Sequence, residues 1–291
     1  MYDILLNPKG GHGESLKALQ VVKETLELAD KEYTVHESEY AGHTIEIVKQ
    51  LNTEKEDLKL IVLGGDGTFN EVLNGIVDFS KITLGLIPCG SGNDFVKASN
   101  HPIKYKDAVD IILKDDAQYV DYIQAGDKRC LNVAGAGMDV DVLVKYASVQ
   151  KLKGKAAYTW ALIYTLLHTR FHHMELTVNG ETYDKNVFMI GIGNGQCIGG
   201  GIKICPNGIV DDGKLDIVAI NEMKKSKIFG RLPQLMKGKH VEHDYSDEYT
   251  ADSCHIKILD DSQFQFDGEI QPVETKEIDL KCVHGELKMY R

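Results

Sequence analysis

Residues 1–114 alternate short apolar runs with amphipathic stretches. In one amphipathic stretch, Leu16, Leu19, Val22 and Leu26 recur at helical spacing. Strands that alternate with helices in this way are typical of βαβ units, which build a parallel sheet. We therefore expect strands at 2–7, 32–38, 58–63 and 82–87, and helices around 16–26, 47–51 and 106–114.

The pattern changes in the remainder of the chain, where strand-like runs dominate. Gly126-Asp127, between two such runs, is a strong hairpin signal. The stretches 155–170 and 225–238 are interpreted as helical insertions. The economical interpretation is a mostly antiparallel β domain that begins near residue 122.

Composition and charge narrow the range of functions. With 291 residues, 43% hydrophobic and 26% charged, the chain can bury the cores of two domains. Its net charge of -11 argues against a nucleic-acid surface, which would need clustered basic residues. The six cysteines form no C-x-x-C pair, so we expect buried, reduced thiols in a cytosolic protein. The opening residues resemble a buried strand rather than a signal peptide, and the longest charge-free run, AAYTWALIYTLLH, is shorter than the roughly 20 residues that span a bilayer.

A glycine-rich turn, LGGDGTFNE, follows the third expected strand. Gly64 and Gly65 lack a Cβ, so the backbone can approach a bulky anion such as a phosphate closely. Asp66 would repel that phosphate unless a cation lay between them. The turn therefore indicates a phosphate site with Mg²⁺, held directly or through water.

Helix capping is a simpler interpretation of the same region. Thr68 and Glu71 have the spacing of a capping box for a helix that begins at Phe69. After the fourth strand, Asn93 or Asp94 would cap a helix that follows a surface turn. Capping and phosphate binding can hold together, and capping alone leaves Asp66 unexplained.

Two further glycine turns, NPKGG (7–11) and IPCGSGNDF (87–95), follow the first and fourth expected strands. In a parallel sheet the carboxyl ends of the strands lie at one edge, where open α/β folds bind ligands. The chain contains no G-x-x-x-x-G-K-[ST] run, and no G-x-G-x-x-G in its first turn. We therefore expect a phosphate site that is neither a P-loop nor a dinucleotide fingerprint.

These three turns, in this order, resemble the catalytic domain of the diacylglycerol kinase and sphingosine kinase superfamily, and the bacterial soluble lipid kinases most of all. The likeness continues through CLNVAGAGMDV, GIGNGQCIGGGIKICPNGIVDDGKLDI and FDGE, and so spans nearly the whole chain. It implies an α/β plus β fold. A three-layer, doubly wound, nucleotide-binding α/β domain of the NAD kinase and phosphofructokinase type is expected over residues 1–122, with residues from about 282 to 291 returning to it. A mostly antiparallel β-sandwich domain for a lipid substrate is expected over residues 123–281.

The resemblance also implies where ATP binds. The expected residues are Asn7, Pro8, Lys9, Gly10, Gly11, Ser38, Gly64, Gly65, Asp66, Gly67, Thr68, Asn70, Glu71, Gly90, Ser91, Gly92 and Asn93. Three positions depart from the family pattern: Ser91 and Gly92 replace threonines, and Cys205 stands where alanine is usual. These changes are small and leave the chemistry intact.

Two magnesium sites follow from the resemblance. Asp66, Asp94 and Asp121 look like the acids of a Mg²⁺ and water network. Asp212, with the backbone carbonyls of Ile209 and Lys214, resembles a separate structural Mg²⁺ site. Without the resemblance, Asp211-Asp212-Gly213 would be interpreted as an ordinary acidic turn.

Asp267 and Glu269 in FDGE resemble the pair that takes the proton from the lipid hydroxyl. Two residues apart, they could share a strand face, and proton transfer of this kind contributes roughly 10² to 10⁴ in rate. On the motif alone, a solvated hairpin turn is the simpler interpretation.

Structural roles are assigned to several residues that could suggest metal ligands. Asp139 and Asp141 are expected on a solvated strand or helix face. A polar helix end is expected for His168, His172 and His173.

A lipid acceptor requires contact with a bilayer. Lys151, Lys153 and Lys155 precede the first helical insertion, whose Trp160 is interpreted as a core or interfacial anchor, and six basic residues lie within 224–239 around the second. Basic side chains beside an exposed apolar surface would dock on anionic lipid, at about 1 kcal/mol each. We expect one of the two stretches to be interfacial. The alternative is that both pack on the domain core behind a solvated lysine face.

These observations predict an ATP- and Mg²⁺-dependent lipid kinase that converts diacylglycerol to phosphatidate in the cytoplasm, peripheral at the inner membrane surface. A kinase of phosphatidylglycerol or of a long-chain base, an NAD kinase and an inactive nucleotide-binding regulator remain alternatives. The order of motifs after residue 88 disfavours NAD kinase, and the presence of all four acids disfavours an inactive regulator: Asp66, Asp94, Asp267 and Glu269. No nucleic-acid partner is expected, and a homodimer remains open because dimers occur among relatives.

Overall fold

Contacts divide the chain into two compact units in a computed structural model that describes residues 1–149, 152 and 154–291. Unit 1 consists of Met1–Tyr122, Ile209–Gly213 and Val283–Arg291. Unit 2 consists of Ile123–Gly208 and Lys214–Cys282.

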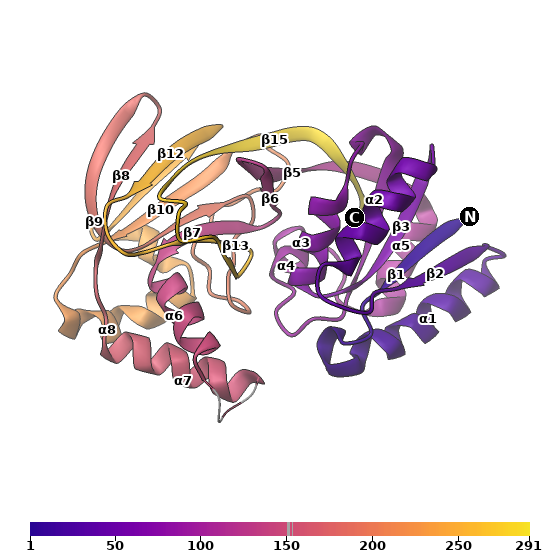
Figure 1. Cartoon of the computed structure of the whole chain (residues 1–291), viewed down its shortest axis with the longest axis horizontal. Coiled ribbons are helices and arrows are strands. Elements are labelled where there is room, and N and C mark those ends of the chain that lie inside the picture. The colour runs from indigo at the N-terminus through magenta and orange to yellow at the C-terminus, as the bar shows by residue number, and fades with distance from the viewer. Residues whose placement is uncertain (150–151, 153) are drawn as a thin grey trace. The chain divides into compact units, whose positions relative to one another are not determined.

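Unit 1 is built on a parallel sheet with the strand order β2-β1-β3-β4, and the end of β15 pairs in parallel with β4 (Figure 1). The strands are β1 (Tyr2–Leu6), β2 (Tyr33–Glu37), β3 (Leu58–Gly64), β4 (Ile82–Pro88) and β15 (Glu277–Tyr290). The central strands are buried almost throughout, as expected for a parallel sheet with both faces covered.

Helices complete the three layers of unit 1. They are α1 (Glu14–Leu28), α2 (His43–Glu54), α3 (Asp66–Gly75), α4 (Asp94–Ala98) and α5 (Tyr105–Lys114), with 3-10 turns η1 (Gly10–Gly13) and η2 (Phe79–Lys81). The apolar stripe of α1, which includes Val22 and Leu26, packs with α5 against Ile61 and Leu63 of β3. Successive strand residues point to opposite faces, so the buried Leu60 faces the other helical layer. The expected doubly wound α/β fold is confirmed.

The start of α3 differs from the expectation. The helix begins at Asp66 rather than Phe69, and its N-cap is Gly65, which has no side chain. Thr68 instead accepts a hydrogen bond from the side chain of Asn7. Glu71 accepts one from the backbone N–H of Gly42. The predicted capping box is therefore wrong, because both side chains bind neighbouring loops.

Unit 2 is antiparallel. Its strands follow the order β14-β13-β7-β9-β8-β12-β15, while β10 pairs with β9 and β11, and β5 pairs with β6 and β15. The bounds are β5 (Ala117–Ala125), β6 (Lys128–Cys130), β7 (Val133–Gly137), β8 (His172–Val178), β9 (Glu181–Gly193), β10 (Leu215–Asn221), β11 (Ser246–Ala251), β12 (Ser253–Ile258), β13 (Phe264–Phe266) and β14 (Glu269–Ile270). The hairpin at Gly126-Asp127 joins β5 to β6 as predicted.

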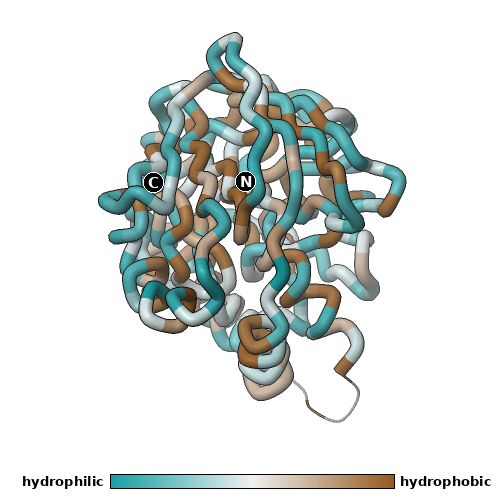
Figure 2. The backbone as a smooth tube through the Cα atoms, turned by 90° about the vertical axis from the view of Figure 1, so that its left-hand side faces the viewer, coloured by the Kyte–Doolittle hydropathy of each residue, from teal (hydrophilic) through white to brown (hydrophobic). Residues whose placement is uncertain are grey.

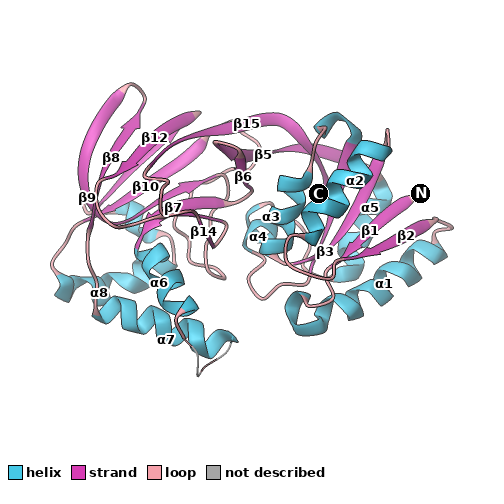
Figure 3. Cartoon of the chain, viewed as in Figure 1, coloured by secondary structure: helices cyan, strands magenta, loops and turns pink. Residues whose placement is uncertain are grey.

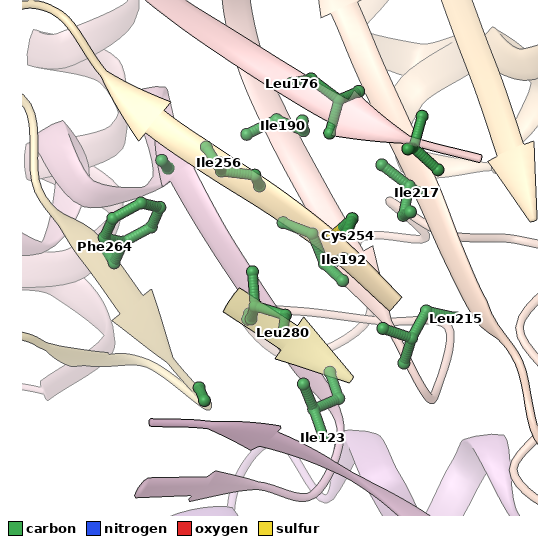
Figure 4. Close-up of a cluster of buried hydrophobic side chains, with 14 of the residues drawn as sticks. Ile123, Leu176, Ile190, Ile192, Leu215, Ile217, Cys254, Ile256, Phe264 and Leu280 are labelled. Atoms are coloured by element: carbon green, nitrogen blue, oxygen red, sulfur yellow. The ribbon is translucent and has the colours of Figure 1, made fainter. Parts of the chain in front are cut away.

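A hydrophobic core fills the sandwich of unit 2 (Figure 4). Leu176, Ile192, Ile217 and Ile256 come from four different strands and are fully buried side chains of this cluster. Each such side chain stabilises the fold by about 1.5–3 kcal/mol relative to an exposed position. The β-sandwich expected from the sequence is confirmed.

Three helices of unit 2 are α6 (Met138–Ala147), α7 (Gly154–Leu167) and α8 (Lys225–Met236), and η3 (Lys239–Glu242) follows α8 (Figure 3). They pack against the sheet through a second apolar cluster, in which Val142, Ala161 and Ile228 meet Met189 and Val218. The two predicted helical insertions correspond to α7 and α8. Within the described residues, no helix is long and apolar enough to cross a membrane.

Two expectations about polar residues are wrong. Asp139 and Asp141 lie in the first turn of α6, and neither has a solvated carboxylate: Oδ1 of Asp139 is buried, and Asp141 pairs with Arg170 and His172. His168 follows the end of α7, as expected, whereas His172 and His173 belong to β8; His172 is buried, and its Nδ1 lies 3.2 Å from Asp260. The run HHMELTV alternates buried and partly exposed residues, which is the pattern of a strand.

Candidate active site

The three glycine turns of unit 1 meet backbone to backbone. A Cβ on Gly11, whose φ is +58°, would lie 1.7 Å from the carbonyl oxygen of Cys89. A Cβ on Gly65 would lie 2.8 Å from the Cα of Gly90, and one on Gly90 would lie 2.7 Å from the Cα of Gly65. Cys89 also donates its N–H to the carbonyl of Gly64 at 2.7 Å. Only glycine allows these turns to approach so closely, and the structure brings them together as the sequence predicts.

Asn7 fixes the turn that follows β1. Its side-chain Nδ2 donates to Thr68 Oγ1 at 3.0 Å, and its Oδ1 accepts from the N–H of Lys9 at 3.1 Å. Its carbonyl accepts from Ser15 Oγ at 2.6 Å and from the N–H of Gly10 at 2.9 Å. Asn7 therefore joins the turns after β1 and β3, while Pro8 lies within the turn that it holds.

The remaining residues expected to contact ATP lie at the same strand ends. Ser38, directly after β2, is buried and donates its N–H to the carbonyl of Leu6 at 2.9 Å. Asn93 has a left-handed backbone with φ +51°, and its side chain bonds to both backbone groups of Gly90. Ser91 and Gly92 lie between Gly90 and Asn93, while Gly67 and Asn70 lie within α3.

Asp66 and Asp94 are brought next to each other. Asp66 Oδ1 accepts the N–H of Asp94 at 2.7 Å and that of Phe95 at 3.4 Å, so its carboxylate lies at the start of α4. The side chain of Asp94 is buried, and the ammonium of Lys97 lies 3.8 Å from Asp94 Oδ1. A metal ion bound by Asp66 and Asp94 would have carboxylate oxygens as ligands, which Mg²⁺ prefers.

Asp121 is held by other parts of unit 1. It is fully buried, and its carboxylate accepts the N–H of Gly213 at 2.7 Å and bonds to His284 Nδ1 at 2.7 Å. Its own N–H donates to the carbonyl of Val210 at 2.7 Å. Among the residues the structure describes, no group of three or more His, Cys, Asp or Glu side chains could hold a metal ion. Asp121 thus anchors the loop 209–213 and does not form a three-carboxylate cluster with Asp66 and Asp94.

The second expected metal site involves that same loop. Ile209 is exposed and belongs to unit 1 together with Asp212. Gly213, with φ +73°, completes the turn before Lys214. Asp211, the neighbouring acid, pairs with Arg291. The loop therefore offers one carboxylate and backbone carbonyls, which is a ligand type that suits Mg²⁺.

The D-G-E turn joins β13 to β14 in unit 2. Asp267 and Gly268 both have positive φ, +49° and +88°, which is the conformation of a type I′ hairpin turn. The carboxylate of Asp267 accepts three backbone N–H groups, from Leu131 at 2.6 Å, Asn132 at 2.9 Å and Val133 at 3.1 Å.

The expected pairing of Asp267 and Glu269 on one strand face is therefore wrong. Asp267 lies in the turn itself, because its positive φ takes it out of the strand, and its side chain points to the backbone of the β6–β7 connection. Glu269 is the first residue of β14 and is exposed. The two carboxylates consequently have different environments.

Gln265 and Asp139 support the D-G-E turn, and sequence reasoning missed both. Gln265 Oε1 accepts the N–H of Gly268 at 2.7 Å, and Gln265 Nε2 donates to Asp139 Oδ2 at 3.1 Å. Burial raises the pKa of Asp139 to about 6, although the hydrogen bonds from the N–H of Val140 and from Gln265 act in the opposite direction. Gly135 leaves room for the pair, since a Cβ there would lie 2.4 Å from Asp139 Oδ2. Gly135 in the motif CLNVAGAGMDV was the sequence feature that could have indicated this close contact.

Comparison with known proteins identifies the family to which these features belong. Residues 2–125 match the family described as the diacylglycerol kinase catalytic domain, and residues 132–290 match the YegS C-terminal NAD kinase beta sandwich-like domain. Two relatives are named diacylglycerol kinase. The chain is 26% identical to that of Bacillus subtilis (strain 168) over 91% of its own length and 88% of the relative, and 28% identical to that of Staphylococcus carnosus (strain TM300), with coverages of 91% and 87%.

Solved structures share the fold. One from Bacillus anthracis str. Sterne superposes with a TM-score of 0.81 at 24% identity, covering 99% of this chain and 94% of that one. A diacylglycerol kinase from the same organism gives a TM-score of 0.74 at 22% identity, with coverages of 99% and 96%. The two family matches together extend over nearly the whole sequence, and the chain belongs to the diacylglycerol kinase-like family of lipid kinases, which are phosphotransferases with an alcohol acceptor.

Proposed function

We propose that this lipid kinase transfers the γ-phosphoryl group of ATP to the primary hydroxyl of diacylglycerol, with Mg²⁺, and yields phosphatidate. The observation that carries the proposal is the convergence of three glycine turns beside Asp66, whose carboxylate accepts the backbone N–H of Asp94. Close backbone turns at strand ends present N–H groups to phosphate oxygens. Phosphoryl transfer asks a protein mainly to position the reactants and offset negative charge.

Asp66 and Asp94 would hold the metal together with phosphate oxygens and water. Mg²⁺ at nucleotide sites is commonly bound by one or two carboxylates and the substrate phosphates, so a pair of acids suffices. When bound, the ion offsets charge on the β- and γ-phosphates. Ile209, Asp212 and Lys214 would hold a second, structural Mg²⁺ through one carboxylate and two carbonyls. Asp121 would support the second site by fixing the loop that contains it.

Glu269 is the residue we assign as general base. The oxygens of Asp267 are occupied by three backbone N–H groups, and protonation of Asp267 would break some of these bonds. Glu269 is exposed at the start of β14, and Asp267 holds the turn that presents it. In the reaction, the hydroxyl proton passes to the Glu269 carboxylate, the lipid oxygen bonds to the γ-phosphorus, and the bond from that phosphorus to the oxygen of ADP breaks.

Diacylglycerol is the leading acceptor because two similar relatives carry the name diacylglycerol kinase. Another similar protein is named a lipid kinase without a stated substrate. Phosphatidylglycerol and long-chain bases offer the same primary hydroxyl, and a test of the acceptor must therefore include them.

The test is incubation with γ-labelled ATP and Mg²⁺ in the presence of a total lipid extract, with identification of the labelled product. We expect labelled phosphatidate, and no product when EDTA replaces Mg²⁺. Labelled product from NAD in a parallel incubation would make the protein an NAD kinase, and a different labelled lipid would replace diacylglycerol as the acceptor. Absence of transfer to any acceptor, with intact ATP binding, would indicate an inactive regulator.

A further inference from the structure

The solvent-facing side of α7 is apolar. Trp160, Ile163, Tyr164 and Leu167 follow the i, i+3, i+4, i+7 spacing of one helix face, and their side chains are 42%, 52%, 36% and 64% exposed. The opposite face of α7, which includes Ala161, packs on the unit 2 core. In Figure 2, brown hydrophobic segments mark the backbone of α7, which lies beside the grey trace. This second apolar face of α7 remains partly exposed to solvent within the described chain.

Helix α6 adds a cation to this apolar face. It packs against α7, and Lys145 of α6 places its Nζ 5.1 Å from the ring centre of Trp160 and 3.8 Å from that of Tyr164. We call these residues the α6–α7 face: Lys145, Trp160, Ile163, Tyr164 and Leu167.

The charge of this part of the chain is compatible with an anionic surface. The segment 142–174 contains no Asp or Glu, although the whole chain has 44 acids and a net charge of -11. It contains Lys145, Lys151, Lys153, Lys155 and Arg170. Lys151 and Lys153 lie outside the described residues, as does the side chain of Lys155. No acidic side chain of this segment would therefore repel an anionic surface.

We propose that the α6–α7 face docks on an anionic lipid bilayer, an inference that rests on the proposed lipid kinase function and assigns the surface that reaches the substrate. Tryptophan and tyrosine favour the headgroup region, and a lysine beside them would meet anionic headgroups. The 14 residues of α7 span about 21 Å, shorter than the hydrocarbon core, so the helix lies along the interface.

Two other arrangements fit the observations less well. A symmetric dimer through this face would place the basic segment of one chain against the same segment of its partner. Helix α8 has more basic residues in its surroundings, but its exposed apolar side chains are only Phe229 and Met236 within the described residues, seven positions apart with Gly230 and Pro233 between them. Of the two stretches that the sequence indicates, α7 is the one with a continuous apolar stripe.

Trp160 reports the contact directly, because it is the sole tryptophan of the chain. The wild-type protein is titrated with vesicles of phosphatidylcholine containing about 30 mol % phosphatidylglycerol, an anionic lipid that gives the vesicles a negative surface potential. We expect a blue shift of the Trp160 emission and protection from iodide quenching, with little change on pure phosphatidylcholine. Vesicle binding measured by sedimentation with no change at Trp160 would overturn the proposal. So would the same blue shift on raising the protein concentration without vesicles, because a second copy would then cover the face.

Matched double variants separate the two helices. Ile163→Ser with Leu167→Ser should weaken vesicle binding at least about tenfold, since two apolar side chains no longer enter the interface. Phe229→Ser with Met236→Ser on α8 should leave binding within about twofold. Equal losses, or a larger loss for the α8 pair, would contradict the proposal. The substituted side chains are exposed, and unchanged thermal unfolding verifies that both variants fold.

Activity on two forms of the acceptor distinguishes docking from catalysis. The α7 double variant should phosphorylate dispersed dioctanoylglycerol at the wild-type rate and lose at least about tenfold on long-chain diacylglycerol in the anionic vesicles. If neither form is phosphorylated even by the wild type, the kinase proposal fails, while the Trp160 titration still decides the docking surface. Equal rates of wild type and variant on vesicles would overturn the docking proposal.

Discussion

The carboxylate of Asp66 accepts the backbone N–H of Asp94 at 2.7 Å. One acid of the expected magnesium pair therefore also stabilises the N-terminus of α4, on which the other acid lies. An aspartate at this point combines a hydrogen-bond acceptor with a negative charge: asparagine removes the charge alone, whereas alanine removes both.

For Asp66, asparagine and alanine should give different results. Asp66→Asn keeps an oxygen that can accept the N–H of Asp94, so the free energy of unfolding should stay within about 1 kcal/mol, while transfer falls at least about 100-fold because the metal loses a charged ligand. Asp66→Ala should lose activity and also about 1–3 kcal/mol of stability. Urea unfolding and labelled-phosphate transfer measure the two effects. Full activity in Asp66→Asn would remove Asp66 from metal binding.

Substitutions of Glu269 and Asp267 should likewise affect activity and stability separately. Glu269→Gln should lower kcat by about 10² to 10⁴ and leave the free energy of unfolding within about 0.5 kcal/mol, because the side chain is an exposed general base. Asp267→Asn should destabilise the protein by about 1–3 kcal/mol, since an amide cannot accept all three N–H groups. Thermal unfolding and initial rates, with ATP binding as the control, test both. An Asp267→Asn variant that is stable and inactive would reverse the assignment.

Stability should depend on pH through Asp139. Burial raises its pKa to about 6 in the folded protein, above the roughly 3.9 of an unfolded chain, so the folded state binds this proton more tightly. The free energy of unfolding therefore falls as pH rises from about 4 to 6, and the cost persists above pH 6. A neutral Asp139→Asn side chain should escape it and gain up to about 3 kcal/mol at pH 7.5, with the gain shrinking towards pH 4. Urea unfolding of both proteins across this range gives the difference curve, and a pH-independent difference would contradict the expectation.

Two glycines of the turn after β3 provide a matched pair. A Cβ on Gly65 would lie 2.8 Å from the backbone of Gly90, whereas on Gly67 it would meet no described atom within 4 Å. Gly65→Ala should therefore lower both stability and ATP affinity. Gly67→Ala should raise the free energy of unfolding by about 0.5–1 kcal/mol, because alanine favours helix α3, and its methyl group should weaken ATP binding if the phosphates lie at the proposed turn. Isothermal titration and urea unfolding test this pair. Normal ATP affinity in Gly67→Ala would place the phosphates elsewhere.

Local patterns were sufficient to predict most of the fold. The alternation of apolar runs and helical stripes predicted the strands and helices of unit 1, because parallel strands covered on both faces must be apolar throughout. The return of Ile209–Gly213 to unit 1 had no sequence signal. That segment is a five-residue loop fixed by Asp121, and a contact between residues 92 positions apart leaves no local periodicity.

The site was predicted less completely than the fold. Glycine turns at strand ends are visible in a sequence because few other reasons place two glycines there, and the structure brings them together. Hydrogen-bond partners are not visible in this way. Asp139 occurs in a stretch with alternating aspartates that resembles a solvated face, and its burial depends on Gly135 of β7 and Gln265 of β13. The different environments of Asp267 and Glu269 were not predictable from the sequence for the same reason. The Asp267 side chain bonds to the backbone of residues 131–133, which is distant in the sequence.

The order of segments in the two units limits how such a protein can be rearranged. The polypeptide changes unit after Tyr122, Gly208, Gly213 and Cys282, and the last segment supplies the strand that pairs with β4 through Lys288–Tyr290. A fragment that stopped at residue 122 would expose the edge of β4 and lose the cover of the buried Tyr290. New acceptor specificities in this architecture should therefore arise through loop changes and point substitutions, because gene fusion or recombination at a single junction would break the sheet that holds the nucleotide turns.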